Sequence, residues 1–205
     1  EQDTVARNYV IWALAVLAEE RAADQIIEAF AAGGLQDMAG FAENGPRVLV
    51  DAVGIARLSS EELMQHDSEA VRVLTAHALA EMASSEVVRP LGDLLRAELV
   101  RENADRSTEV IRATTAGLGR TGDPRAAEPL FALLEREPGF QNLVSDALRK
   151  SVAGPGLVTL LGQARSEANR TDLIRLIANT HDPRVADALA GELDDPDAAI
   201  RAIAA

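Results

Sequence analysis

The chain has 205 residues, of which 47% are hydrophobic, 3% are aromatic and none is cysteine. The lack of cysteine excludes disulfides and thiolate metal or redox sites. An excess of 33 acidic over 20 basic residues, a formal charge of −13, disfavours general binding to nucleic acid because phosphate backbones are repelled. No uncharged apolar run reaches the roughly 18 residues of a membrane span. We therefore expect a cytoplasmic protein without a cofactor or metal.

The basic residues are almost all arginine, since Lys150 is the only lysine. An acidic chain that avoids lysine is typical of salt-loving microbes. A GC-rich genome that favours arginine codons produces the same bias, so both interpretations stay open. Neither of them points to an enzyme.

The first third of the chain predicts two regular helices and then an irregular segment. Apolar residues at helical spacing predict helices over 3–18 and 22–32. The segment 33–67 fits this pattern badly, because Gly33-Gly34, Gly40 and Gly45-Pro46 are helix breakers. It predicts one helix over 46–58, a short one over 60–64, and a degenerate repeat or insertion with a long connection.

The rest of the chain alternates helices and turns more regularly. Helices are predicted over 68–82 and 86–99, with a cap at Ser84-Ser85 before the second. Ser107 caps a helix that contains Leu118 and that Gly119 and Gly122 break, and Asp123 caps the next helix, with Pro124 in its first turn. Further helices are predicted over 140–152, 157–161, 169–178, 184–193 and from 197 onward, with turns at 154–156 and 181–183.

A turn sequence recurs within this region. The segment 121–127, Thr-Gly-Asp-Pro-Arg-Ala-Ala, returns as 180–186, Thr-His-Asp-Pro-Arg-Val-Ala, each time between two helical patterns. The apolar anchors of the first helices, Leu79, Leu118, Leu148 and Ile177, are separated by 39, 30 and 29 residues. Such periods hold two helices and tight turns, so we predict an all-α fold built as a helical repeat array.

The segments 116–119, Ala-Gly-Leu-Gly, and 123–130, Asp-Pro-Arg-Ala-Ala-Glu-Pro-Leu, resemble the short HEAT repeats related to those of the phycobilisome lyases. The resemblance covers most of the chain, strongly over 68–205 and weakly over 33–67. It implies a right-handed α-solenoid of about six HEAT-like helix pairs, a single array over 1–205. Because these repeats occur in scaffolds, chromophore lyases, hydroxylases and DNA-repair proteins alike, it predicts fold better than function.

The family geometry implies that the second helix of each pair lines a concave groove. Its polar residues are then the candidates for binding a protein partner: Asp24, Glu28, Arg89, Asp93, Arg96, Arg125, Glu128, Glu135, Arg184 and Asp187. The alternative is that these residues are only the solvated face of amphipathic helices.

Arginines recur at corresponding positions near the start of the first helices, at Arg7, Arg72, Arg170 and Arg201, while Ile111 and Gln141 interrupt the series. Stacked repeats bring equivalent positions close together. We therefore predict an inter-repeat ladder that also includes the turn aspartates Asp123 and Asp182, with arginine favoured by its rigid fork of donors. Anion binding along the ladder is the functional alternative.

Catalytic motifs are weak in this sequence. His66, His77 and His181 are scattered, and none is followed by glutamate as in the di-iron hydroxylases with HEAT repeats. The chain contains no phosphate-binding loop, zinc-protease motif or nucleophile elbow. The acidic turn 194–197 lacks the 12-residue loop of a dedicated calcium site, and a helix cap explains it more simply.

We therefore expect a non-catalytic protein-interaction scaffold or adaptor. A bilin-lyase-like or other small-ligand enzyme is the alternative, because lyase residues do not form a short motif. A third hypothesis is a structural segment of a larger multidomain protein, since the sequence starts at Glu1 rather than methionine and its last segment stops within a helical pattern.

Overall fold

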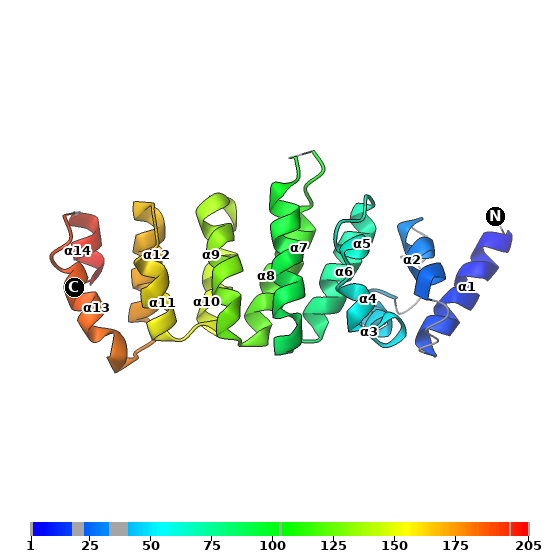
Figure 1. The fold of residues 1–205 in the computed structure, drawn as a ribbon, viewed down its shortest axis with the longest axis horizontal. Coiled ribbons are helices and arrows are strands. Elements are labelled where there is room, and N and C mark those ends of the chain that lie inside the picture. Colours follow the sequence, from blue (N-terminus) through cyan, green and yellow to red (C-terminus); the bar gives the residue numbers. More distant parts are fainter. Residues whose placement is uncertain (1, 18–22, 33–40, 103, 197, 205) are drawn as a thin grey trace. The chain divides into compact units, whose positions relative to one another are not determined.

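The computed structural model describes residues 2–17, 23–32, 41–102, 104–196 and 198–204. Within these ranges the chain consists of helices joined by turns (Figure 1), which confirms the predicted all-α class. The predicted helix ends at Ala18, Ala22 and Ala205, the breakers at 33–34 and 40, and Asp197 lie outside the described residues. The helices are α1 (Gln2–Val16), α2 (Ala23–Ala31), α3 (Phe41–Val53), α4 (Ile55–Leu58), α5 (Glu61–Met64), α6 (Glu69–Glu81), α7 (Val88–Val100), α8 (Thr108–Thr121), α9 (Ala127–Arg136), α10 (Gln141–Ser151), α11 (Gly154–Leu161), α12 (Glu167–Ala178), α13 (Ala186–Glu192) and α14 (Ala198–Ala204).

The chain divides into two compact units, Glu1–Gly117 and Leu118–Ala205, with the boundary inside α8. In the first unit α3 packs against both α1 and α6, and α2 packs against α1 and α6. The short helix α4 contacts α6, and α5 contacts both α6 and α7, so the described part of the irregular segment, 41–67, is integrated into the helical packing. Residues of α6, α7 and α8 form a buried apolar cluster: Ala76, Leu94, Val110 and Ala113.

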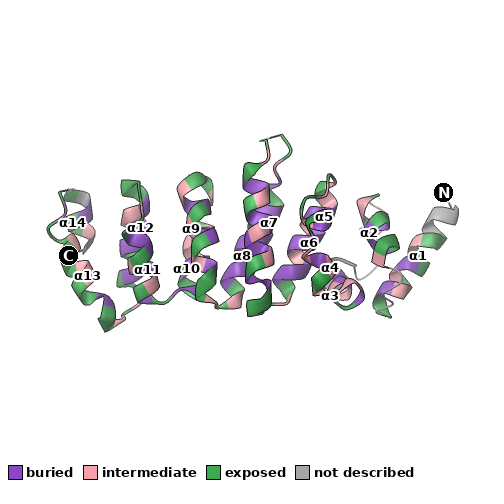
Figure 2. Ribbon diagram, in the orientation of Figure 1, coloured by how far each residue is buried: buried purple, intermediate pink, exposed green. Residues whose placement is uncertain are grey.

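In the second unit α12 contacts α10, α11 and α14, while α10 packs against α9 and α13 against α14. The buried positions run along the helix faces that meet these neighbours (Figure 2). Leucine and isoleucine dominate the apolar core of this unit: Leu130, Leu133, Leu134, Leu148, Leu157, Leu173, Ile174 and Ile177.

The two recurrent turns have the same geometry. Asp123 Oδ1 accepts the backbone N–H of Arg125 at 2.9 Å, and Asp182 Oδ1 accepts that of Arg184 at 3.0 Å. This confirms Asp123 as a cap, although it caps a 3₁₀ turn, Pro124–Ala126, that precedes α9. His181 occupies the left-handed conformation (φ 53°) that Gly122 adopts in the first turn (φ 62°). His181 therefore has the turn role expected from its position.

Serine caps are also confirmed. Ser107 Oγ accepts the N–H of Val110 at 3.2 Å at the start of α8. Ser84 Oγ accepts the N–H of Glu86 at 3.3 Å, ahead of α7. Each of these bonds is local, which is why the sequence alone predicts it.

Several predicted breaks do not occur. Gly119 does not end α8, which continues to Thr121. Pro46 lies inside α3, so Gly45-Pro46 is no breaker, and the predicted helix over 46–58 is interrupted instead at Gly54, with φ 78°. The residues 154–156 form the first turn of α11 rather than a loop, where Pro155 needs no intrahelical N–H partner.

Close helix packing explains the glycines of α8. A Cβ on Gly119 would lie 2.8 Å from the Cα of Ala147 in α10, and one on Gly117 would lie 2.6 Å from the Cβ of Ala80 in α6. These glycines therefore let neighbouring helices approach each other instead of ending their own helix. Across the described part of the chain, no helix is both long and apolar enough to cross a membrane.

Candidate functional site

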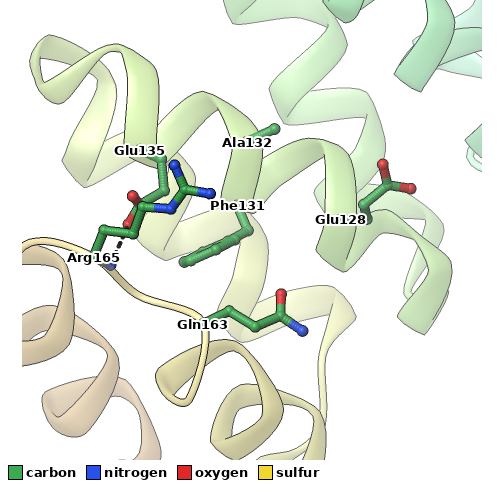
Figure 3. A pocket seen from close by; sticks show the side chains of 6 residues that line it. All are labelled: Glu128, Phe131, Ala132, Glu135, Gln163 and Arg165. Atoms are coloured by element: carbon green, nitrogen blue, oxygen red, sulfur yellow. Dashed lines mark hydrogen bonds between the residues drawn. The ribbon is translucent and has the colours of Figure 1, made fainter.

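A cleft in the second unit lies between α9 and the loop that follows α11 (Figure 3). It has a volume of about 540 Å³ and is lined by Glu128, Phe131, Ala132, Glu135, Gln163 and Arg165. The four residues of α9 recur at intervals of three and four, so they share one face of that helix. We call these six residues the α9 cleft.

The sequence predicted two members of the α9 cleft, Glu128 and Glu135, as groove residues. Phe131 was missed because an apolar residue on an amphipathic helix is normally assigned to the core. Its side chain is only partly buried, and Figure 3 shows the ring on the side of α9 that faces Gln163 and Arg165. These last two residues belong to a loop, for which helical periodicity gives no signal.

Glu135 holds the wall of the α9 cleft in place. Its Oε1 accepts a hydrogen bond from Asn169 Nδ2 at 2.8 Å and another from the backbone N–H of Arg165 at 3.3 Å. Ser166 caps α12 beside this contact by accepting the N–H of Asn169 at 3.1 Å. Glu135 is thus a positioning residue, while Glu128 is exposed and Phe131 is partly exposed on the same face of α9.

A smaller cleft in the first unit contains two further predicted residues, Asp24 and Glu28 of α2. It has a volume of about 320 Å³, and Ile27, Ala31, Arg57, Glu62 and His66 complete its lining. Arg57 bridges the cleft, with its Nη2 3.1 Å from both Asp24 Oδ1 and Glu62 Oε1. Glu28 lies 4.0 Å from Arg7. Most charges of this cleft are therefore paired across it.

All but one of the remaining predicted groove residues, Asp187, form local ion pairs. On α7, Asp93 lies between Arg96, at 2.5 Å, and Arg89, at 3.7 Å, with one helical turn between partners. Arg125 and Arg184 bind the turn aspartates Asp123 and Asp182, and Asp187 is exposed on α13. The structure thus brings the predicted residues together in pairs and triplets.

The pKa values of Asp123 and Asp182 lie below the usual range for aspartate. The largest cause is the hydrogen bond from the side chain of the arginine two residues later, followed by the bond from its backbone N–H. Both aspartates are therefore engaged within their own turns, and their described partners are Arg125 and Arg184, not the arginines of the predicted ladder.

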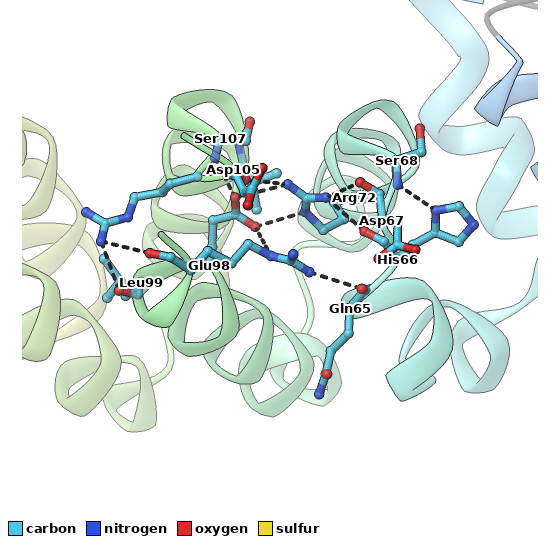
Figure 4. A network of polar contacts seen from close by, with 12 residues as sticks. Gln65, His66, Asp67, Ser68, Arg72, Glu98, Leu99, Asp105 and Ser107 are labelled. Carbon is cyan, nitrogen blue, oxygen red and sulfur yellow. Dashed lines mark hydrogen bonds and ion pairs between the residues drawn. The ribbon is translucent and has the colours of Figure 1, made fainter. Parts of the chain in front are cut away.

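The arginines of the predicted ladder bind other groups. Arg72 is 2% exposed and lies against Glu98 at the end of α7, which is fully buried (Figure 4). Its Nε donates to Glu98 Oε2 at 3.0 Å and its Nη2 to Oε1 at 3.3 Å. The guanidinium also donates to the carbonyls of His66, Asp67 and Asp105, at 2.8, 3.0 and 2.9 Å. All five N–H donors of Arg72 are satisfied.

Glu98 in turn fixes the connection between α7 and α8. Its Oε1 also accepts the backbone N–H of Ser107, the residue that caps α8. Arg106 donates to the carbonyls of Leu99 and Arg101 at 3.2 and 3.3 Å in the same connection. This network holds the extra residues that lengthen the interval between Leu79 and Leu118.

Two other ladder arginines repeat parts of this pattern. Arg201 Nη1 donates to the carbonyls of Asp195 and Pro196, six and five residues earlier, as Arg72 does to His66 and Asp67. Arg170 binds Glu192 at 2.7 Å and the buried Asp195 at 2.5 Å, which links α12 to the end of α13 and to the turn before α14. The sequence did not predict Glu98, Glu192 and Asp195 as partners of these arginines, since each is one carboxylate among 33 acidic residues.

The histidines remain apart from each other. His66 Nδ1 receives the N–H of Ser68 at 3.0 Å, His77 Nε2 lies 3.1 Å from Glu109, and His181 sits in its turn. Among the described residues, no group of three or more His, Asp or Glu side chains is arranged to hold a metal ion. Compared with known proteins, the chain matches no protein-family model and no curated protein sequence.

Proposed function

We propose that this protein is a non-catalytic interaction scaffold or adaptor whose second helices bind a segment of another protein. In this proposal the fold is a right-handed α-solenoid of about six helix pairs of the short HEAT type. The observation that supports it best is the α9 cleft, where Phe131 is partly exposed between polar residues on the helix face predicted to line the groove.

The chemistry of the α9 cleft favours a particular kind of contact. An aromatic ring beside a carboxylate accepts an apolar or cationic side chain, because the ring provides contact area and the carboxylate provides charge. Phe131 and Glu128 form this combination, while Gln163 offers an amide to the backbone of a bound segment. A protein segment that presents a basic residue next to apolar ones fits this site.

Photocrosslinking tests the proposal. A benzoylphenylalanine placed at Phe131 is expected to crosslink to a defined protein in lysate of the source cells, and the same group at Phe140, at the start of α10, serves as the matched control. Charge reversal by Glu128→Arg is expected to reduce the crosslink at least tenfold. Arg112 is exposed on α8, outside the α9 cleft, and Arg112→Glu is expected to leave the crosslink unchanged. Equal crosslinking from Phe131 and Phe140 would show that the α9 cleft is the wrong surface.

The volume of the α9 cleft also favours a second candidate, a small-ligand-binding or bilin-lyase-like enzyme, because clefts of about 300–1,000 Å³ accommodate small molecules. Native mass spectrometry and an absorption spectrum of the purified protein test this alternative. A retained ligand that Phe131→Ala releases would support it, and a clean spectrum and mass would count against it.

A further inference from the structure

Helix α1 carries apolar side chains on two opposite faces. Ile11 and Ala15 are buried against the rest of the first unit, as expected for a packed helix. On the other face Tyr9, Val10, Val16 and Leu17 are 59, 60, 56 and 75% exposed. Together with the exposed Ala6 and Ala13, they follow the three- and four-residue spacing of one helix face. We call these six residues the α1 stripe.

The corresponding face of later first helices is buried. When Arg7 is aligned with Arg72, most of the α1 stripe corresponds to four buried residues of α6: Val71, Leu74, Thr75 and Ala78. In α8 the corresponding residues are also buried: Val110, Ala113, Thr114 and Gly117. Gly117 lies directly against Ala80 of α6, the first helix of the preceding pair. The α1 stripe therefore has the composition of a helix-packing face, yet it is exposed.

The electrostatics of α1 favour contact with a second copy. The chain has a formal charge of −13, so two copies repel each other over most surfaces. Between Ala6 and Leu17 there is no acidic residue, and Arg7 is the only charged one. Two copies that meet through this stretch therefore bring no acidic residue of it into contact.

The α1 stripe is also complementary to itself. In an antiparallel pair of α1 helices centred between Ile11 and Trp12, Ala6 faces Leu17 of the other copy and Val10 faces Ala13. In these two pairings a small residue lies opposite a larger one, as in close-packed helix interfaces. Arg7 faces Val16, which its aliphatic stem is able to cover.

From these observations we propose that two copies of this protein associate through antiparallel packing of their α1 stripes. A patch of this kind amounts to a few hundred Å² per copy, so two patches together fall below the roughly 1,200 Å² of stable interfaces. The dimer is therefore weak, with a Kd on the order of 10–500 µM. Salt strengthens it, because salt screens the repulsion between acidic chains.

Sedimentation equilibrium over a range of concentrations, at low and high NaCl, tests the association. Monomers at low concentration are expected to become dimers at high concentration, and the Kd is expected to fall severalfold at high salt. The combined variant Val10→Glu with Leu17→Glu should stay monomeric while retaining the helical circular dichroism of the parent. Val100→Glu places one such charge on an apolar residue of α7 that is 71% exposed, and it should dimerise like the parent.

Disulfide trapping tests the antiparallel arrangement, since the native chain has no cysteine. When copies with Val10→Cys are mixed with copies with Ala13→Cys, the disulfide between the two variants should form faster than the disulfide between two copies of either variant. The same result is expected for Ala6→Cys mixed with Leu17→Cys. A monomer under all conditions overturns the proposal, as does a dimer that survives both glutamate substitutions. The proposal would also be overturned if most disulfides joined two copies of the same cysteine variant. Binding of the α1 stripe only to a helix of a different protein would overturn it as well.

Discussion

Arg72 and Glu98 form the most completely buried ion pair described in this protein. A pair of this kind adds little stability compared with an apolar pair of equal volume, but removal of one partner leaves an uncompensated charge in the interior. Here the cost is increased because Glu98 also holds the N–H of Ser107. The two residues therefore act as one structural unit that joins three segments of the first unit.

We predict that Glu98→Ala lowers the free energy of unfolding by about 3–5 kcal/mol. The smaller change Glu98→Gln should cost about 1–3 kcal/mol, because the amide keeps one acceptor but loses the charge. Urea unfolding followed by circular dichroism measures both. Glu102→Gln, an exposed change in the same connection, is the control and should stay within about 0.5 kcal/mol of the parent. A similarly small effect of Glu98→Ala would contradict the role assigned to the pair.

The recurrent turns predict a pH dependence. The pKa of Asp182 is lowered in the folded protein relative to its ordinary value of 3.8, chiefly by the side chain of Arg184. Because the folded state favours the ionised form, this contribution to stability is fully present above the unfolded pKa. It is lost as the pH falls through the lowered, folded pKa. Asp123 behaves in the same way through Arg125.

We therefore expect Asp182→Asn to lower the melting temperature at pH 7 and to make progressively less difference below about pH 4. Asparagine retains an acceptor for the Arg184 N–H, so the comparison isolates the charge from the cap. Asp187→Asn, an exposed residue of α13, controls for the change in net charge. A constant difference between Asp182→Asn and the parent from pH 7 to pH 3 would refute this explanation.

At the scale of the helices, the contact between α6 and α8 depends on the absence of a side chain. A Cβ on Gly117 would lie 2.6 Å from the Cβ and 2.9 Å from the Cα of Ala80. The obstacle includes backbone, which is unable to move aside as a flexible side chain does. The spacing of these two helices is therefore set by residues that lack bulk.

Gly117→Ala should destabilise the protein by about 1–3 kcal/mol through overpacking, although alanine favours helix by about 1 kcal/mol. Ala80→Gly in the same chain should restore part of this loss, and a double-mutant cycle by urea unfolding measures the coupling. Gly162→Ala is the matched control, since its nearest neighbour would be an ordinary 3.6 Å away. Additive effects of Gly117→Ala and Ala80→Gly would show that the two positions do not clash.

The same helices show which features the sequence was able to predict. Asp123, Ser107 and Ser84 were identified as caps because the atoms that they bind lie within three residues. The end of α8 was misplaced at Gly119 because only the neighbouring Ala147 explains that glycine. The position of Phe131 in the α9 cleft likewise depends on a loop more than thirty residues later. Features that depend on bonds within a few residues could therefore be predicted from the sequence, whereas features that depend on tertiary packing could not.

At the scale of the whole molecule, the acidic excess gives a testable effect on stability. With a formal charge of −13, the folded chain repels itself, and added salt screens this repulsion. Surface pairs such as Arg149 with Asp146 are weakened by the same salt, but isolated exposed pairs contribute little. The screening of the net charge should therefore outweigh the loss of pairs.

We predict that the melting temperature rises by several degrees between low salt and about 1 M NaCl. A variant that neutralises three exposed acids, Glu69→Gln, Glu86→Gln and Glu102→Gln, should show a smaller rise. Differential scanning calorimetry on the two proteins provides the measurement. A melting temperature that falls with salt would mean that the ion pairs dominate over the net charge.

The hydrogen bonds of the two recurrent turns suggest how gene duplication is able to lengthen such a chain. The carboxylate of Asp182 binds its near neighbour Arg184. The hydroxyl of Thr180 donates to the carbonyl of Ile177 and accepts the N–H of Asp182, so the bonds of this turn join residues that lie within a few positions of each other. A gene duplication that copied this stretch would carry every required partner with it. Arg72, by contrast, needs three separate stretches of chain to change together. The network around Arg72 is therefore difficult to reproduce at a second place in the chain by copying one short stretch.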